Sequence, residues 1–142
     1  MSHEQTHDRV RRWVRLPASA EEVWAVVGGF GAVADWHPSV SESPVFEMEG
    51  ETCRHLALSD GGLFLDALRE QGPTSYRYAV MDGPAALGEA RGAFSAVAEP
   101  DGGCHVYWSL DFEPADAAAD AIVAGLIESG LEALRARWGA AG

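Results

Sequence analysis

The chain has 142 residues, 47% of them hydrophobic, which is enough for one buried core and too little for two domains of ordinary size. Ten basic residues stand against 22 acidic ones, and the formal net charge of -12 argues against nucleic acid as a partner. All ten basic residues are Arg, so Schiff-base chemistry through a lysine amine is excluded. The N-terminus has no apolar signal stretch and no segment is long enough to span a bilayer, so we expect a cytoplasmic protein without membrane insertion.

The cysteines and the N-terminal arginines could each indicate a site, a disulfide or metal site in the first case and an anion site in the second. Cys53 and Cys104 lie far apart in the sequence and lack the spacing of a disulfide scaffold or a zinc site, so we interpret them as free thiols. A basic cluster in the first strand-like segment is better explained as a solvated face, balanced by acids elsewhere, than as an anion site. Its members are Arg9, Arg11, Arg12 and Arg15.

The N-terminal part of the chain predicts one strand and two short helices. Arg9–Leu16 has the alternating pattern of an amphipathic strand. Ser19 and Glu22 have the spacing of a capping box, and the apolar residues after them predict a helix. Glycines end that helix, and Ala32–Trp36 predicts a second one that must end before Pro38.

The middle of the chain predicts an antiparallel sheet. Short apolar runs alternate there with turns rich in Gly, Pro and Asp. Successive turns this short connect antiparallel neighbours, because a parallel crossover needs a dozen or more residues. Six further strands fit between the turns: Pro44–Met48, Thr52–Ser59, Leu63–Glu70, Ser75–Met81, Glu89–Glu99 and His105–Glu113.

The C-terminal part predicts one long helix. After Pro114 the apolar residues recur at helical spacing as far as Trp138 and form a wide stripe. Gly125 and Gly130 thin the middle of this stripe. The thinning leaves two interpretations open: the helix lies close to the sheet, or there is room beside it for a ligand.

A family resemblance is carried by short motifs spread over the chain. They are Pro17-Ala18-Ser19-Ala20-Glu21-Glu22-Val23-Trp24, Phe30, Asp35-Trp36-His37-Pro38, Asp60-Gly61-Gly62, Tyr76-Arg77-Tyr78, Val106-Tyr107-Trp108-Ser109 and Phe112-Glu113-Pro114. With this order of elements, the chain resembles the polyketide cyclase/dehydrase-like branch of the START-like (SRPBCC) superfamily from about Arg9 to Trp138.

The resemblance implies an α+β helix-grip fold. In this fold a seven-stranded curved antiparallel sheet wraps around a long C-terminal helix, with two short helices between strands 1 and 2. It implies a single START-like domain over residues 1–142, with 1–8 as a flexible N-terminus. It also implies a deep cavity between sheet and helix, which relatives use to carry lipids, sense hormones or fold polyketide chains.

The chain departs from its relatives at two places. Relatives commonly have Glu-Arg-Leu on the strand after the Asp-Gly-Gly turn, whereas this chain has Asp66-Ala67-Leu68. The acid is thus one methylene shorter and the adjacent Arg is missing. A proline-containing loop is represented by Gly83–Leu87, with one proline where relatives often have two.

Strand alternation and the resemblance together predict a ligand pocket. Side chains two residues apart on a strand share a face, which separates inward from outward positions. The inward set is mainly aromatic and aliphatic with a few polar groups, as a small-molecule pocket requires. The candidate pocket residues are Trp36, His37, Arg54, Leu56, Phe64, Asp66, Tyr76, Tyr78 and Trp108.

Several candidate residues have a structural interpretation beside the functional one. His37 is either an acid/base group at the pocket mouth or, as we favour, a loop histidine at a helix end. Tyr76 and Tyr78 either offer hydroxyls to a ligand or form an ordinary packed pair. Cys53 and His55 share a strand face, but a third and fourth ligand at recognised spacing are missing, so we expect no metal. We assign no catalytic residue and expect no cofactor.

The most specific prediction is an ion pair between Arg54 and Asp66. If the turn between their strands has three residues, Leu56 opposes Asp66 and Arg54 lies diagonally across from that acid. Two charges that face an apolar cavity must pair, because an uncompensated buried charge costs several kcal/mol. A one-residue change in the loop would instead turn Arg54 toward solvent.

These observations favour one function and keep two others open. The favoured hypothesis is a protein that binds or carries a small hydrophobic, lipid- or polyketide-like metabolite. The alternative is a cyclase/dehydrase-type enzyme that uses the same cavity, with His37, Asp66 or a Tyr moving protons. A third possibility is a partner-binding domain. The sequence leaves monomer and homodimer open.

Overall fold

In the computed structural model, residues 10–84, 87, 89–113 and 117–139 are described. The predicted flexible segment 1–8 and part of the predicted loop at Gly83–Leu87 lie outside these residues. The elements in chain order are β1 (Val10–Leu16), α1 (Ala20–Val27), α2 (Val33–Trp36), β2 (Val40–Glu42), β3 (Val45–Met48), β4 (Glu51–Leu58), β5 (Leu63–Gly72), β6 (Ser75–Asp82), β7 (Ala90–Ala98), β8 (Cys104–Phe112) and α3 (Ala117–Trp138).

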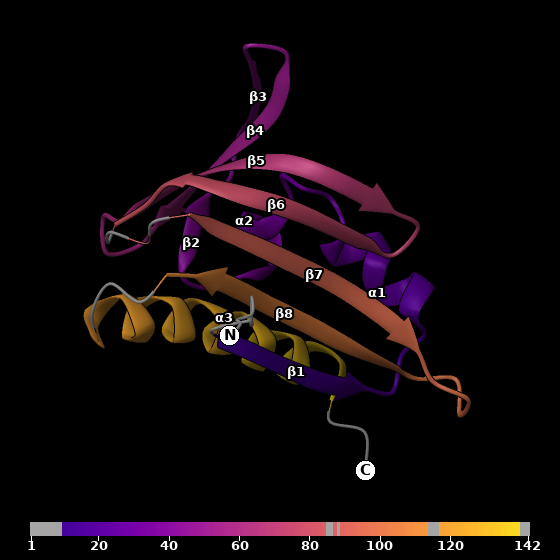
Figure 1. Ribbon diagram of the computed structural model, residues 1–142. Helices are drawn as coiled ribbons and strands as arrows, with labels where there is room; N and C mark the ends of the chain where they lie inside the picture. The colour runs from indigo at the N-terminus through magenta and orange to yellow at the C-terminus, as the bar shows by residue number, and fades with distance from the viewer. Residues whose placement is uncertain (1–9, 85–86, 88, 114–116, 140–142) are drawn as a thin grey trace, which may run out of the picture.

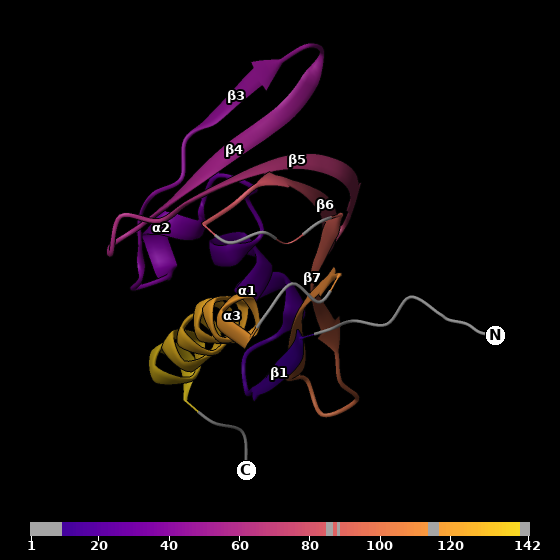
Figure 2. The ribbon, with the colours of Figure 1, turned by 60° about the vertical axis from the view of Figure 1, so that its left-hand side comes forward.

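The strands form one curved antiparallel sheet in the order β1-β8-β7-β6-β5-β4-β2. All three helices lie on its concave side, and α3 runs along β1 and β8 (Figures 1 and 2). The helix-grip arrangement, the two short helices and the seven strand positions are as predicted. β2 was not predicted: it pairs with one end of β4, while the predicted strand at Pro44–Met48 corresponds to β3, which pairs with the other end.

Local signals explain the boundaries of the helices near the N-terminus. The Ser19 hydroxyl accepts a hydrogen bond from the Glu22 backbone N–H at 3.1 Å, so the predicted N-cap of α1 is present. α2 ends at Trp36, two residues before Pro38. Together α1 and α2 bring Phe30 and Trp36 over the sheet, where both are buried.

The core lies between the concave face of the sheet and the helices. Inward residues of β6, β7 and β8 alternate with outward ones, as the period of a strand requires. The inward rings pack against each other and against α2: Trp36 stacks on Phe94 with centroids 5.6 Å apart, and Phe94 meets Trp108 edge to face at 5.4 Å.

The two cysteines occupy distant places in this sheet. Cys53 lies on β4 and Cys104 on β8, with β5, β6 and β7 between them, and both are free and buried. The prediction of unpaired thiols is confirmed. Burial raises the pKa of both thiols above the ordinary value, which lowers the fraction of reactive thiolate.

We therefore expect thiol titration to depend on folding. Without reductant, a thiol reagent should find two groups in denatured protein and react much more slowly with native protein. A count of zero in denatured monomer would contradict the strand order, because it would require the two cysteines to have met.

Candidate functional site

The centre of the concave face holds a buried ion pair. Arg54 on β4 and Asp66 on β5 are at most 1% exposed, and Arg54 Nε donates to Asp66 Oδ2 at 2.9 Å. The predicted pair is thus confirmed, but its register was wrong. Arg54 lies directly opposite Asp66, because Leu58 and Gly62 already close the turn with a hydrogen bond of 2.8 Å.

Further partners surround the guanidinium of Arg54. Its Nη1 donates to the backbone oxygen of Phe30 at 2.9 Å and to the hydroxyl of Tyr76 at 3.0 Å. The group also lies over the rings of Phe30 and Tyr78, 4.2 and 4.7 Å from their centroids. Hydrogen bonds and ring faces therefore replace most of the water that the charge gave up.

The ion pair is not fully satisfied by the protein. Arg54 Nη2 and Asp66 Oδ1 are buried and have no hydrogen-bond partner among the described residues. Burial raises the pKa of the Asp66 carboxyl above its ordinary value, against the lowering effect of Arg54. Within the described part of the chain, the pair thus leaves one buried donor and one buried acceptor without a partner.

A second polar contact joins Tyr78 and Trp108. The Trp108 indole N–H donates to the Tyr78 hydroxyl at 2.9 Å, and both residues are buried. Burial also raises the pKa of Tyr78 above its ordinary value, so the phenol stays neutral. The ring of Tyr78 lies over Gly92, where any side chain would overlap it. Both side chains are thus held in place by packing and by each other.

His37 follows α2 and binds α3. Its Nε2 lies 2.6 Å from the backbone oxygen of Leu126, so this nitrogen carries the proton and donates. Its Nδ1 accepts a hydrogen bond from the Ser39 backbone N–H at 3.1 Å. Both ring nitrogens are therefore engaged, and the interpretation of His37 as a histidine fixed at a helix is the one that its contacts support.

Neutral His37 makes the fold sensitive to acid. Burial lowers the pKa of His37 below its ordinary value, outweighing the hydrogen bond to Leu126. A proton on Nδ1 would also oppose the Ser39 N–H. A base with a lowered pKa binds fewer protons when folded, so its contribution is complete above pH 6.5 and is lost as pH falls below it, by up to about 1.4 kcal/mol per pH unit.

Denaturant melts between pH 7.5 and 5.0 test this expectation. The free energy of unfolding should fall more steeply with acid in the wild type than in His37→Gln, which cannot take up the proton. Only the slopes are compared, because the substitution also changes stability at neutral pH. Equal slopes in the two proteins would show that His37 is not held neutral.

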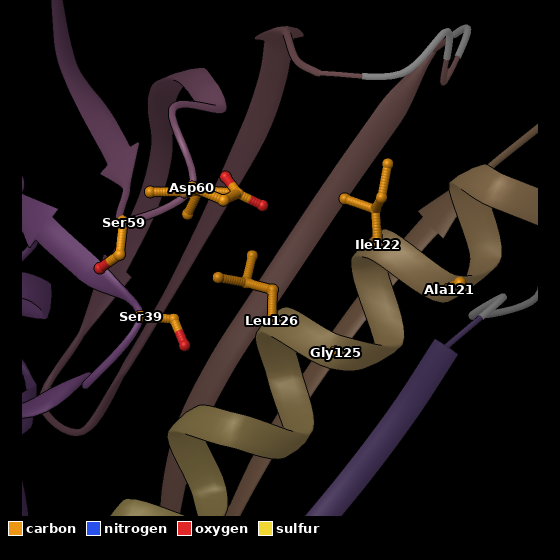
Figure 3. Close-up of a pocket in the computed structure, with 8 residues that line it drawn as sticks. Ser39, Ser59, Asp60, Ala121, Ile122, Gly125 and Leu126 are labelled. Carbon is orange, nitrogen blue, oxygen red and sulfur yellow. The ribbon is translucent and has the colours of Figure 1, made fainter.

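An open groove runs beside the N-terminal half of α3. It has a volume of about 380 Å³ and lies between α3, the start of β2 and the turn from β4 to β5 (Figure 3). We call it the α3 groove. Its lining residues are Ser39, Leu58, Ser59, Asp60, Ala121, Ile122, Gly125 and Leu126.

The two glycines of α3 have different surroundings. A Cβ at Gly125, which lines the α3 groove, would have no atom within 4 Å. A Cβ at Gly130 would lie 2.7 Å from His37 Cδ2 and 2.8 Å from Trp108 Cζ3. Both interpretations of the thinned stripe therefore hold, one at each glycine: Gly130 permits close packing and Gly125 leaves room.

The structure brings several of the nine candidate residues together. All nine are buried, and none lines the α3 groove. Arg54, Asp66 and Tyr76 form one hydrogen-bonded cluster. His37 and Trp108 form a second contact, with their ring centroids 5.8 Å apart. A role of these residues in binding a ligand stays a prediction.

Sequence reasoning missed two parts of the site. Phe30 supplies a backbone acceptor to Arg54, which no side-chain pattern reveals. The lining of the α3 groove was also missed: the glycines of α3 indicated room beside the helix, but none of the eight lining residues was among the candidate pocket residues. Among the described residues, no group of His, Cys, Asp and Glu has a geometry that would hold a metal ion. Nor does any helix in that part of the chain have the length and apolarity to cross a bilayer.

Comparison with known proteins places the chain in a family. A family model described as polyketide cyclase / dehydrase and lipid transport matches residues 7–139. The chain belongs to this family. No curated protein matches the sequence significantly.

Solved structures agree with the family and its START-like fold. The protein XoxI from Bacillus cereus is 25% identical, with a TM-score of 0.81 over 91% of this chain and 94% of that one. A START superfamily protein from Mycobacterium smegmatis is 20% identical, with a TM-score of 0.70 over 91% and 95% of the two chains. The ZhuI aromatase/cyclase from Streptomyces sp. R1128 is 22% identical, with a TM-score of 0.63 over 92% and 84%. The last two likenesses concern the fold alone.

Proposed function

We propose that this protein binds and carries a small, mostly hydrophobic molecule in the α3 groove. The observation that carries the proposal is the groove itself, whose volume of about 380 Å³ lies within the range of small-molecule sites. Leu58, Ile122 and Leu126 give it apolar walls. Ser39, Ser59 and Asp60 give it a polar rim (Figure 3). The family description, which includes lipid transport, supports the same class of ligand.

In this proposal the nine buried candidate residues do not contact the solvent-exposed groove directly but form the core wall beneath it. Two residues connect the groove with this wall. Leu126 lines the groove and accepts the hydrogen bond of His37, and Leu58 continues along β4 to Leu56 and Arg54. An apolar ligand that enters beside Gly125 therefore lies next to the aromatic core.

Carriage explains the contacts of the polar residues better than catalysis does. A proton-transfer mechanism needs an acid or base that is free to reach the substrate. His37 has both nitrogens bound within the protein, and the Tyr78 hydroxyl already accepts from Trp108. Asp66 is paired with Arg54 through Oδ2, and its other oxygen is buried in a residue that is 1% exposed. These commitments support a binding role.

Filling the groove should abolish binding while the fold is kept. Gly125→Leu places an isobutyl group in the groove, where no atom lies within 4 Å of the new Cβ. Fluorescence titration with a neutral environment-sensitive dye such as Nile red should show at least tenfold weaker binding than in the wild type. Native mass spectrometry of freshly purified protein should show the same loss for any ligand retained from the cell.

The matched control places the same side chain elsewhere on α3. Ala136 is exposed and lies outside the groove, so Ala136→Leu should bind the dye as the wild type does. Trp108→Phe tests the buried candidate residues separately from the groove, because it makes a core side chain smaller without filling the groove. Equal dye affinity in wild type and Gly125→Leu would overturn the proposed site.

A further inference from the structure

Among the residues that the structure describes, a single charged side chain lines the α3 groove. Of its eight lining residues only Asp60 ionises. Figure 3 shows its carboxylate turned toward α3, where it faces Ile122 and Leu126 across the groove, while the Ser59 hydroxyl points away from the helix. The side of the groove formed by α3 consists of apolar residues and Gly125, so it offers no group that would neutralise the acid.

A chemically equivalent turn elsewhere in the sheet shows that the turn itself does not require an aspartate without an ion-pair partner. Asp60 Oδ1 accepts the backbone N–H of Gly62 at 2.9 Å, and Asp101 Oδ1 accepts that of Gly103 at 2.9 Å. Asp101 also forms an ion pair with Arg15. Among the described residues, no basic side chain lies within ion-pair distance of Asp60. The turn at the groove therefore keeps its negative charge available.

The rest of the chain does not offset this charge. The protein has a net charge of -12. The arginine at the centre of the concave face and the one beside α3 already have ion-pair partners. Arg54 is buried against Asp66, and Arg12 pairs with Glu128 on the side of α3 toward β1. Because a carboxylate ligand would meet Asp60 without a counter-ion, the groove disfavours anions and favours cations.

We propose that the α3 groove selects an apolar molecule with a positively charged group, such as a protonated amine, over a carboxylate of the same chain length. This inference rests on the proposed function and names its ligand class. The apolar chain contacts Leu58, Ile122 and Leu126, and the cation lies at Asp60. The head group is thus recognised at the rim of the groove, where it remains partly in water.

Three probes of equal chain length test the selection. Decylamine, decanol and decanoate are titrated against full-length protein by displacement of Nile red, at low ionic strength and below their aggregation concentrations. Decylamine should bind about tenfold more tightly than decanoate, with decanol between them, and the difference should shrink as salt is added. Decanoate binding as tightly as decylamine would overturn the inference.

Two substitutions with the same change in net charge separate local from general attraction. Asp60→Asn keeps the acceptor for Gly62 and should remove most of the preference for the amine. Asp101→Asn also keeps its acceptor, for Gly103, and should leave the preference as in the wild type. Equal effects of both variants would assign the preference to overall charge and overturn the inference.

The outcomes also distinguish this inference from the proposed function. If decanol binds and Gly125→Leu abolishes that binding, but the three head groups bind alike, the groove is a ligand site without charge selection. If neither Nile red nor any probe binds the wild type, the proposed function itself fails. Only the expected order, lost in Asp60→Asn and kept in Asp101→Asn, supports both.

Discussion

Arg54→Ala is expected to lower the free energy of unfolding by about 3–5 kcal/mol, because it leaves Asp66 as a buried carboxylate without its partner. The variant also removes the hydrogen bonds to the backbone of Phe30 and to Tyr76. Asp66→Ala should have an effect of similar size, since the guanidinium would then stay buried with one hydrogen-bonding group fewer. Urea denaturation at pH 7 measures both.

The double variant and a matched exposed pair complete this experiment. Arg54→Ala with Asp66→Ala should cost less than the sum of the single variants, with a coupling energy of about 1–3 kcal/mol. The control is Arg69→Ala, which breaks an ion pair with Glu51 between the same two strands at 43% and 41% side-chain exposure, and should cost under about 1 kcal/mol. Small, additive losses for Arg54 and Asp66 would mean that the buried pair does not form.

The second large effect is a pair of identical substitutions in α3 that should change the free energy of unfolding in opposite directions. Gly125→Ala should raise the free energy of unfolding by up to about 1 kcal/mol, because alanine favours a helix and the new Cβ meets no atom. Gly130→Ala gains the same propensity but forces its Cβ against His37 and Trp108, so it should lower stability by about 1–3 kcal/mol.

The comparison is decisive because both variants replace Gly by Ala in the same helix, so that only the surroundings of the new Cβ differ. Neither His37 nor Trp108 moves away easily: the first is bound through both nitrogens and the second through its indole N–H. The two unfolding free energies should therefore differ by about 2–4 kcal/mol. Two variants of equal stability would show that α3 does not approach the sheet at Gly130.

Much of the fold was predictable because local signals agree with one another. The capping box at Ser19, the proline after α2 and the short turns between strands each indicate a boundary, and together they allow few topologies. β2 was missed because three residues give no measurable alternation. Its pairing with β4 becomes visible only when the sheet is assembled.

The ion pair was predictable even though its register was not. The predicted and observed pairings of β4 with β5 differ by two residues, and a shift of two keeps every side chain on its face. Arg54 and Asp66 therefore stayed on the concave side in both. A shift of one residue would instead have placed Arg54 and Asp66 on opposite faces of the sheet.

The remaining parts of the site depend on contacts that sequence patterns do not encode. His37 binds the backbone of Leu126, 89 residues away, and the α3 groove exists only where α3 passes the turn from β4 to β5. Any residue type supplies a backbone oxygen, so Leu126 and Phe30 carried no signal for these roles. Only the two glycines in α3 hinted at the groove and at the close approach beside it.

The most direct test of the account is a nuclear magnetic resonance titration of ¹⁵N-labelled protein with decanol. If a small apolar molecule binds in the α3 groove, saturable amide shifts should cluster at Ser39, at Leu58–Asp60 and at Gly125–Leu126, and Gly125→Leu should abolish them. Amides of the turn at Asp101, at the far end of the sheet, should stay unchanged. Shifts that do not saturate, or that cluster away from α3 and persist in Gly125→Leu, would contradict the claim that this groove is the ligand site.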